Sequence, residues 1–208
     1  MKILIGTTNP SKVEQFAEML SGFGVDFMTL NDLGITDEPT ETGKTPQENA
    51  MIKAAFYGRY AQNVICADSG LYFDCLPLED DRQPGLHIRT PGGGRRLDDE
   101  EMIAHYAQLV HNLGGSVMAY YLNGFAVKTD GQIHGFQWTR EEAKLGAFYM
   151  LDTPRRERNP GWPLDSLSVD MKGVSFVDPQ WEETPQLDWA RESRLRTFLI
   201  EKLGLTEK

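Results

Sequence analysis

The sequence predicts an α/β fold in which helices flank a mixed central sheet. Over residues 2–76, strongly apolar runs typical of strands alternate with amphipathic helical segments. Later, two further strand-like runs flank Asp130-Gly131, a pair typical of a tight hairpin turn. The 208 residues contain no internal repeat and no clean linker, so we expect one domain over residues 1–208 with two lobes.

The first elements are a strand, a helix and a second strand. Residues 2–7 form a short apolar run, and Asn9 then supplies a favourable N-cap for a helix with Pro10 at its first position. Apolar residues recur at helical spacing until Gly22 ends the helix. A second strand is expected over residues 25–30.

The second helix has the clearest start in the chain. Thr45 is its cap, Pro46 takes the first position, and Glu48 stands where a capping box requires an acid. The helix is expected to end near residue 61. A strongly apolar third strand follows over residues 63–67 and ends at a charged residue.

The rest of the chain is expected to divide into an extended segment at 71–76, an irregular segment at 77–96, a helix at 99–113, two strands at 116–129 and 132–139, an irregular segment at 141–185 and a last helix at 187–203.

Composition limits the function. The chain has 21 Lys and Arg against 31 Asp and Glu, a net charge of −10, which argues against a partner that is a nucleic-acid polymer. Two cysteines are too few for a disulfide framework. The chain contains no signal-peptide pattern and no run near the ~20 apolar residues that span a membrane. We therefore expect a cytoplasmic protein without a membrane partner.

A first candidate site lies between the first strand and the first helix. Thr7, Thr8 and Asn9 precede a helix N-terminus, where free backbone N–H groups and the helix dipole favour anions. Lys12 is unfavourable to that dipole, so it needs another reason to be there. The alternative is that Asn9 is only a cap and Lys12 only a solvated residue.

A second candidate group surrounds the third strand. Asp68 and Ser69 follow an apolar strand, and a buried carboxylate needs a partner. In open α/β sheets, ligands bind at the carboxyl ends of strands. Glu41 and Lys53 flank the start of the second helix. The alternatives are an Asx-turn aspartate, a helix-surface lysine and, for Glu48, a purely structural cap.

These motifs together resemble the Ham1/inosine triphosphate pyrophosphatase family. The family pattern T-G-N-x-x-K corresponds to residues 7–12, with Thr8 in place of glycine. E-T-G-x-T-F-x-E-N-A-x-x-K-A is nearly complete at residues 41–54, and A-D-D-S-G-L corresponds to residues 66–71 with one of the two aspartates kept. The P-G-x-Y pattern resembles residues 84–87. The resemblance covers residues 3–90 and decays after residue 95.

Two later motifs of the family are altered here. G-F-G-Y-D-P corresponds to residues 161–165, which include Trp162 and Asp165. S-H-R corresponds to Ser193-Arg194 without the histidine. The phosphate-binding half of the family pattern is therefore kept, while the half that contacts the nucleoside has diverged.

The resemblance implies a two-lobed fold with a cleft between the lobes, and a Mg²⁺-dependent pyrophosphatase that converts a nucleoside triphosphate, such as the non-canonical purine nucleotides ITP or XTP, to the monophosphate and pyrophosphate. It also implies a homodimer. Asp68 would be a metal ligand and the base for the attacking water, and Glu41 a second ligand or a residue that orients the water. Glu38 and Glu48 are reserve candidates.

The remaining implied roles concern substrate binding. The residues that would bind phosphate are Lys12 and Lys53 as cations, with Thr7, Thr8, Asn9 and Ser69 as donors; Trp162 would stack on the base and Asp165 would accept a hydrogen bond from its edge. Two alternatives stay open: a non-catalytic nucleotide-binding or regulatory module on the same fold, and a Mg²⁺-dependent phosphatase for another phosphorylated small molecule.

Overall fold

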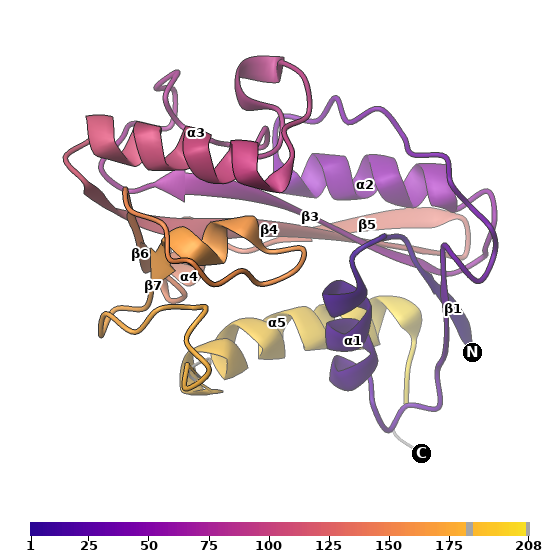
Figure 1. The fold of residues 1–208 in the computed structure, drawn as a ribbon. Helices are drawn as coiled ribbons and strands as arrows, with labels where there is room; N and C mark the ends of the chain where they lie inside the picture. Colours follow the sequence, from indigo (N-terminus) through magenta and orange to yellow (C-terminus); the bar gives the residue numbers. More distant parts are fainter. Residues whose placement is uncertain (182–184, 207–208) are drawn as a thin grey trace. The chain divides into compact units, whose positions relative to one another are not determined.

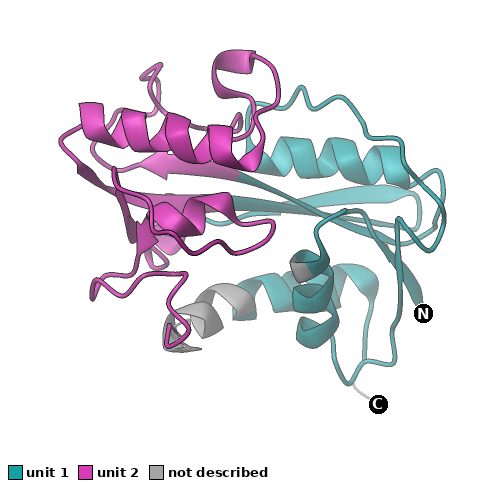
Figure 2. Cartoon of the chain, in the orientation of Figure 1, with its two compact units in different colours: residues 1–69, 123–139, 186–208 teal, residues 70–122, 140–185 magenta. Residues whose placement is uncertain are grey.

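The computed structural model describes residues 1–181 and 185–206, and for residue 11 and residues 185–192 it describes the backbone alone. The chain divides into two compact units (Figure 2). Unit 1 comprises residues 1–69, 123–139 and 186–208, and unit 2 comprises residues 70–122 and 140–185. The expected cleft between two lobes stays a prediction.

Seven strands form a mixed sheet, which confirms the predicted α/β class (Figure 1). The strand order is β2-β1-β3-β4-β6-β7, with β5 paired to β4. β1 runs parallel to β2 and β3, whereas the β4–β5, β4–β6 and β6–β7 pairs are antiparallel. The strands are β1 (Lys2–Ile5), β2 (Asp26–Thr29), β3 (Val64–Phe73), β4 (Ser116–Thr129), β5 (Gln132–Gln137), β6 (Phe148–Leu151) and β7 (Ser168–Val169).

The helices are α1 (Pro10–Met19), α2 (Pro46–Tyr57), α3 (Asp99–Asn112), α4 (Arg140–Lys144) and α5 (Pro185–Leu203), with short 3₁₀ turns at Pro91–Gly93 and Pro163–Leu167. In unit 1, α2 covers one face of the sheet, and α1 and α5 lie on the other (Figure 1). Asn9 occupies the expected cap position of α1, because its carbonyl accepts the Val13 N–H at 3.4 Å.

One core cluster of unit 1 lies beneath α2. Ala50, Ala54 and Tyr57 of that helix pack against Leu4 and Cys66, which belong to two neighbouring parallel strands. Small side chains on the inward face of α2 let the helix approach the sheet closely. The core of unit 2 is separate: α3 packs there against strand residues of the same unit, and the Tyr106 hydroxyl donates to the Ile88 carbonyl at 3.0 Å.

Two glycines let α2 lie on the β4–β5 hairpin. A Cβ atom on Gly124 would lie 2.1 Å from the Gln47 backbone nitrogen and 2.3 Å from the Pro46 carbonyl carbon. A Cβ atom on Gly135 would meet the Gln47 side chain at 2.4 Å and the Met51 sulfur at 2.8 Å. Because neither glycine has a side chain, the N-terminus of α2 can lie directly on the hairpin.

Three expectations about local structure are wrong. The third strand does not end at residue 67 but continues through Asp68, Ser69 and Gly70 to Phe73. α2 ends at Tyr57 rather than near residue 61. There Lys128 Nζ donates to the Gly58 carbonyl at 2.6 Å and satisfies a group that the helix end leaves open.

The third wrong expectation concerns residues 141–185, which are not irregular throughout. They contain most of α4 together with β6, β7 and a 3₁₀ turn. The last helix is close to its predicted range, and its buried side chains Leu195, Leu199 and Leu203 repeat at the expected spacing. Short elements of two to five residues carry too few periodic positions for a pattern to identify them.

The capping box expected at α2 is only half formed. Thr45 accepts the Glu48 N–H at 3.1 Å, but the Glu48 carboxylate accepts the Lys44 N–H at 2.6 Å instead of the N–H of the cap residue. A reciprocal capping box occurs at α3, between Asp98 and Glu101.

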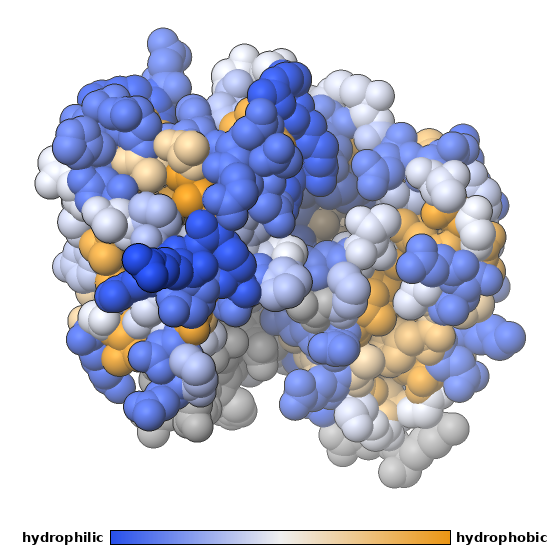
Figure 3. Space-filling model, viewed as in Figure 1, coloured by the Kyte–Doolittle hydropathy of each residue, from blue (hydrophilic) through white to orange (hydrophobic). Residues whose placement is uncertain are grey.

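The visible surface in Figure 3 is mainly hydrophilic, with smaller groups of hydrophobic residues between polar ones. The large exposed hydrophobic residues among those described are spread along the sequence from Met1 to Met171. Within the described ranges, no helix is both long and apolar enough to cross a lipid bilayer.

We predict that Gly124→Ala destabilises the protein much more than Gly135→Ala. The first Cβ collides with backbone atoms of the α2 start, whereas the second meets the ends of two flexible side chains. Overpacking costs about 1–3 kcal/mol, and each kcal/mol lowers Tm by about 2–4 °C in a chain of this size. Thermal unfolding followed by circular dichroism measures both variants. Equal Tm values for the two would show that α2 does not depend on the Gly124 approach.

Candidate active site

A cluster of side chains in unit 1 brings together five of the residues singled out in the sequence, four of them charged. Lys53 Nζ lies 2.7 Å from Glu41 Oε1 and 2.8 Å from Asp68 Oδ1. The Asp68 side chain is only 13% exposed and that of Lys53 18%, whereas that of Glu41 is 41% exposed. Lys12 approaches the same cluster through Ser69. We call these five residues the lysine–carboxylate cluster.

The local fold explains how the cluster forms. Asp68 lies within β3, not after its end as the sequence suggested, and successive strand residues face opposite sides. Asn49 and Lys53 are four residues apart on α2, so they project from the same face of the helix. Glu41 comes from the segment that precedes α2, and its carboxylate pairs with Lys53.

Asn49 is a member of this site that lies within the motif matched at residues 41–54 but received no role in the sequence analysis. Its side chain is 2% exposed, and Nδ2 donates to Asp68 Oδ2 at 3.0 Å. Its Oδ1 accepts the Gly43 N–H at 2.8 Å. The available signal was a polar residue next to Ala50, the first of the apolar residues that α2 buries against the sheet.

The structure shows why a lysine stands at position 12, where the helix dipole alone would disfavour it. Its Nζ donates to Ser69 Oγ at 3.4 Å. Burial of the ammonium, followed by repulsion from Lys53, lowers the pKa of Lys12 to about 8, although Asp68 and Glu41 act in the opposite direction. An amine with this pKa loses its charge in a moderately alkaline solution.

Lys53 differs from Lys12 in its charge balance. Burial tends to lower the pKa of Lys53, but attraction and hydrogen bonds from Asp68 and Glu41 outweigh burial and raise it. Lys53 is therefore a permanent cation. Its neighbour Cys66 is a neutral thiol, because burial raises its pKa to about 12.

The residues at the start of α1 have mainly local contacts. Thr7 Oγ1 accepts the Asn9 N–H at 3.1 Å, which fixes the turn before the helix. Thr8 is exposed and Asn9 half-buried. Glu48 serves the backbone of the α2 start, which supports its structural alternative, and Glu38 is exposed. The phosphate-binding roles of Thr7, Thr8 and Asn9 stay predictions.

Trp162 and Asp165 belong to unit 2 and are described within it. Trp162 is 41% exposed. Asp165 Oδ2 accepts a hydrogen bond from Asn159 Nδ2 at 2.8 Å. Burial raises the pKa of Asp165, with the Asn159 hydrogen bond opposing it. An exposed ring and a half-buried acceptor have the chemistry for base recognition, and that role stays a prediction.

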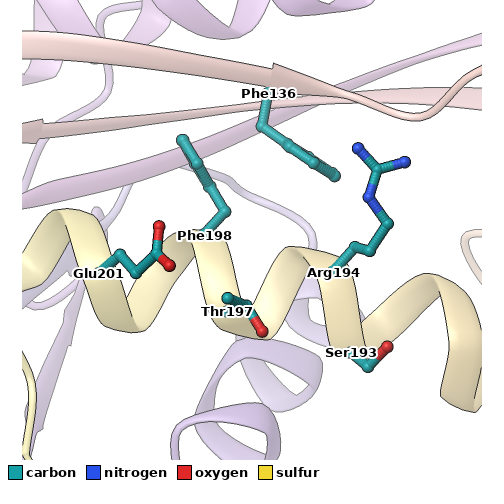
Figure 4. A pocket seen from close by; sticks show the side chains of 6 residues that line it. All are labelled: Phe136, Ser193, Arg194, Thr197, Phe198 and Glu201. Carbon is teal, nitrogen blue, oxygen red and sulfur yellow. The ribbon is translucent and has the colours of Figure 1, made fainter.

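Ser193 and Arg194 line an open hollow of about 280 Å³ between α5 and β5 (Figure 4). Phe136 and Phe198 stack there with ring centroids 5.2 Å apart, and the Arg194 guanidinium lies 5.4 Å from the Phe136 ring centroid. Thr197 and Glu201 complete the lining. None of the predicted phosphate-binding residues lines this hollow.

The expected metal ligands amount to two carboxylates. Asp68 and Glu41 both pair with Lys53. Within the described ranges, there is no group of three or more His, Cys, Asp or Glu side chains that could hold a metal ion. Mg²⁺ commonly binds through one or two carboxylates and completes its shell with water and substrate phosphates. The donor set therefore fits Mg²⁺ bound together with a phosphate substrate.

Comparisons with known proteins identify the family of this chain. The chain is 39% identical to a dITP/XTP pyrophosphatase of Thermoanaerobacter pseudethanolicus over 98% of both chains. It also resembles a solved HAM1 protein from Coxiella burnetii, with a TM-score of 0.67, 21% identity and coverage of 97% of this chain and 99% of that one.

A Ham1 protein of Staphylococcus aureus gives a TM-score of 0.66 at 20% identity, covering 97% of this chain and all of that one. At 20% and 21% identity, the similarity to these two structures shows the fold alone. The family model described as the Ham1 family matches residues 3–142, which include all five residues of the lysine–carboxylate cluster. This chain belongs to the Ham1 family.

Proposed function

We propose that this protein is a nucleoside triphosphate pyrophosphatase, which hydrolyses a nucleoside triphosphate to the monophosphate and pyrophosphate. The observation that carries the proposal is the largely buried Asp68 carboxylate, held by a lysine that also pairs with the Glu41 carboxylate, with Lys12 nearby. The activity in the names of its relatives supports this reaction class.

Two lysines are suited to bind the phosphates. Transfer of a phosphoryl group depends on positioning and on charge neutralisation more than on covalent chemistry. Lys12 and Lys53 would neutralise phosphate oxygens, and the Ser69 hydroxyl, already within reach of Lys12, would donate to another. The N–H groups at the start of α1, with Thr7, Thr8 and Asn9, would add neutral donors.

Asp68 is our candidate for the base. Its two oxygens have separate partners, so the carboxylate has a defined orientation from which to accept a proton from the attacking water. Glu41 is more exposed and would orient that water. The proton leaves the water as its oxygen attacks the α-phosphorus, and pyrophosphate departs with the electrons of the broken P–O bond.

We also propose that the reaction requires Mg²⁺, held by Asp68 and Glu41. When bound, the ion would supply additional positive charge for the phosphates. Lys53 forms ion pairs with both carboxylates in the structure described here, and it would contact phosphate instead when a cation pairs with these acids.

For the substrate, we propose a free non-canonical purine nucleotide such as ITP or XTP. Two relatives carry dITP/XTP pyrophosphatase as their name, one of them 39% identical over 98% of this chain. Trp162 and Asp165 are the proposed base contacts in unit 2. The homodimer implied by the family resemblance is likewise part of the proposal.

The direct test is pyrophosphate release from ITP, XTP and the four common nucleoside triphosphates, with Mg²⁺ or with EDTA. We expect turnover of at least one purine triphosphate, fastest with ITP or XTP, and its loss in EDTA. Release of inorganic phosphate instead would favour the phosphatase alternative. Binding of nucleotides without any turnover would favour the non-catalytic module.

Asp68→Asn is expected to lower kcat by at least about 100-fold, because a positioned base contributes on the order of 10²–10⁴ to the rate. Lys53 keeps Glu41 as an ionic partner, so the variant should remain folded by circular dichroism. Asp26→Asn, an exposed aspartate of β2, is the matched control. Wild-type turnover in Asp68→Asn would remove Asp68 from the mechanism.

Lys12 predicts an alkaline limit to the activity. Its ammonium is charged below its pKa of about 8 and neutral above it, so kcat/KM for the triphosphate should fall as the pH rises through 8. In Lys12→Arg the side chain stays charged and the limit should move to higher pH. Initial rates between pH 6 and pH 10 test this, and an identical limit in both proteins would assign it to another group.

A further inference from the structure

Asn49 is a buried residue whose side-chain oxygen and nitrogen both form hydrogen bonds inside the site. Its side chain is 2% exposed, and it stands four residues before Lys53 on the same face of α2. Oδ1 accepts the Gly43 N–H at 2.8 Å, and Nδ2 donates to Asp68 Oδ2 at 3.0 Å. A buried polar side chain is costly unless such bonds are made.

The contact with Asp68 determines how the carboxylate is turned. Lys53 Nζ holds Oδ1 at 2.8 Å, while Asn49 holds Oδ2. An ammonium on a flexible stem attracts a carboxylate from many directions, whereas a packed amide donates along one. Asn49 is therefore the partner that restricts rotation of the Asp68 carboxylate about its own axis.

The contact with Gly43 fixes the segment that carries Glu41. Gly43 stands two residues after Glu41, and a Cβ atom on it would lie 2.6 Å from Asn49 Oδ1 and 2.7 Å from the Glu48 Cβ. This backbone is thus held directly against the first turn of α2. The Asn49 amide therefore supports both carboxylates of the lysine–carboxylate cluster: it binds Asp68 directly, and it holds the backbone near Glu41.

We propose that Asn49 is a positioning residue of the pyrophosphatase reaction, which sets the orientation of Asp68 and the place of the Glu41 segment without touching the substrate. This inference rests on the proposed function. It predicts that loss of the amide impairs turnover and cation binding, while the lysines that bind the triphosphate keep their positions.

The main test is Asn49→Leu, which keeps the size of the side chain and removes both hydrogen bonds. We expect kcat to fall about 10- to 100-fold, as for other residues that support catalytic ligands. KM for the triphosphate should stay within about 2-fold, because its phosphate contacts are unaltered. Mn²⁺ binding without nucleotide, followed by electron paramagnetic resonance, should weaken about 10-fold.

Two further variants separate positioning from general stability. Asn63→Ala removes another asparagine of unit 1, which bonds Thr129 and the Lys2 carbonyl, and should lower Tm but leave kcat and Mn²⁺ affinity unchanged. Gly43→Ala keeps Asn49 but displaces its Oδ1, so it should lower kcat in the same way even if Asn49→Leu does not fold.

The outcomes distinguish this inference from the proposed function. If the wild-type protein turns over triphosphates and both Asn49→Leu and Gly43→Ala keep kcat and Mn²⁺ affinity within about 3-fold, Asn49 is a structural residue only and the inference is overturned. If the wild-type protein is inactive, the proposed function fails, and the Mn²⁺ affinities of the same variants still decide whether Asn49 positions the carboxylates.

Discussion

The contact on which the site depends is the ammonium of Lys53 between Asp68 and Glu41. A carboxylate in the middle of a buried strand is unfavourable by itself, and removing one partner of a buried ion pair costs about 3–5 kcal/mol. Because these side chains are partly exposed, the loss of stability is smaller here, but removing a partner still destabilises the protein. The pairing allows β3 to continue through Asp68, where an unpartnered charge would favour a turn.

The surrounding structure of unit 1 places that ammonium. α2 has to lie close enough for Lys53 to reach Asp68, and the hairpin beneath the helix permits this because Gly124 and Gly135 have no side chains. The Thr45 cap sets where the helix starts, and the spacing of four residues then aligns Asn49 with Lys53. Two features without chemical function, a cap and two glycines, therefore determine the geometry of the charged groups.

The sequence predicted the parts of this arrangement that local patterns encode. Apolar runs identified the main strands, Asp130-Gly131 identified the hairpin, and motif spacing singled out Asp68, Glu41 and the two lysines. The continuation of β3 was not predictable, because Asp-Ser-Gly is typical of a turn and its partners lie on another element. Asn49 was missed for the same reason: its two bonds reach backbone and side chains that only packing brings near.

The charges within the site give the net charge of −10 a specific consequence for triphosphate binding. Within the cluster, the charges of Lys12 and Lys53 are matched by those of Glu41 and Asp68, so the site has no excess positive charge for a triphosphate. If Lys53 turns to a phosphate, it leaves two carboxylates without a cation, in a chain whose overall field already repels anions. The Mg²⁺ ion that we propose would resolve both problems at once, since carboxylate oxygens are ligands that Mg²⁺ accepts. In the proposed mechanism, the acidic composition would make the cation and the triphosphate each strengthen the binding of the other.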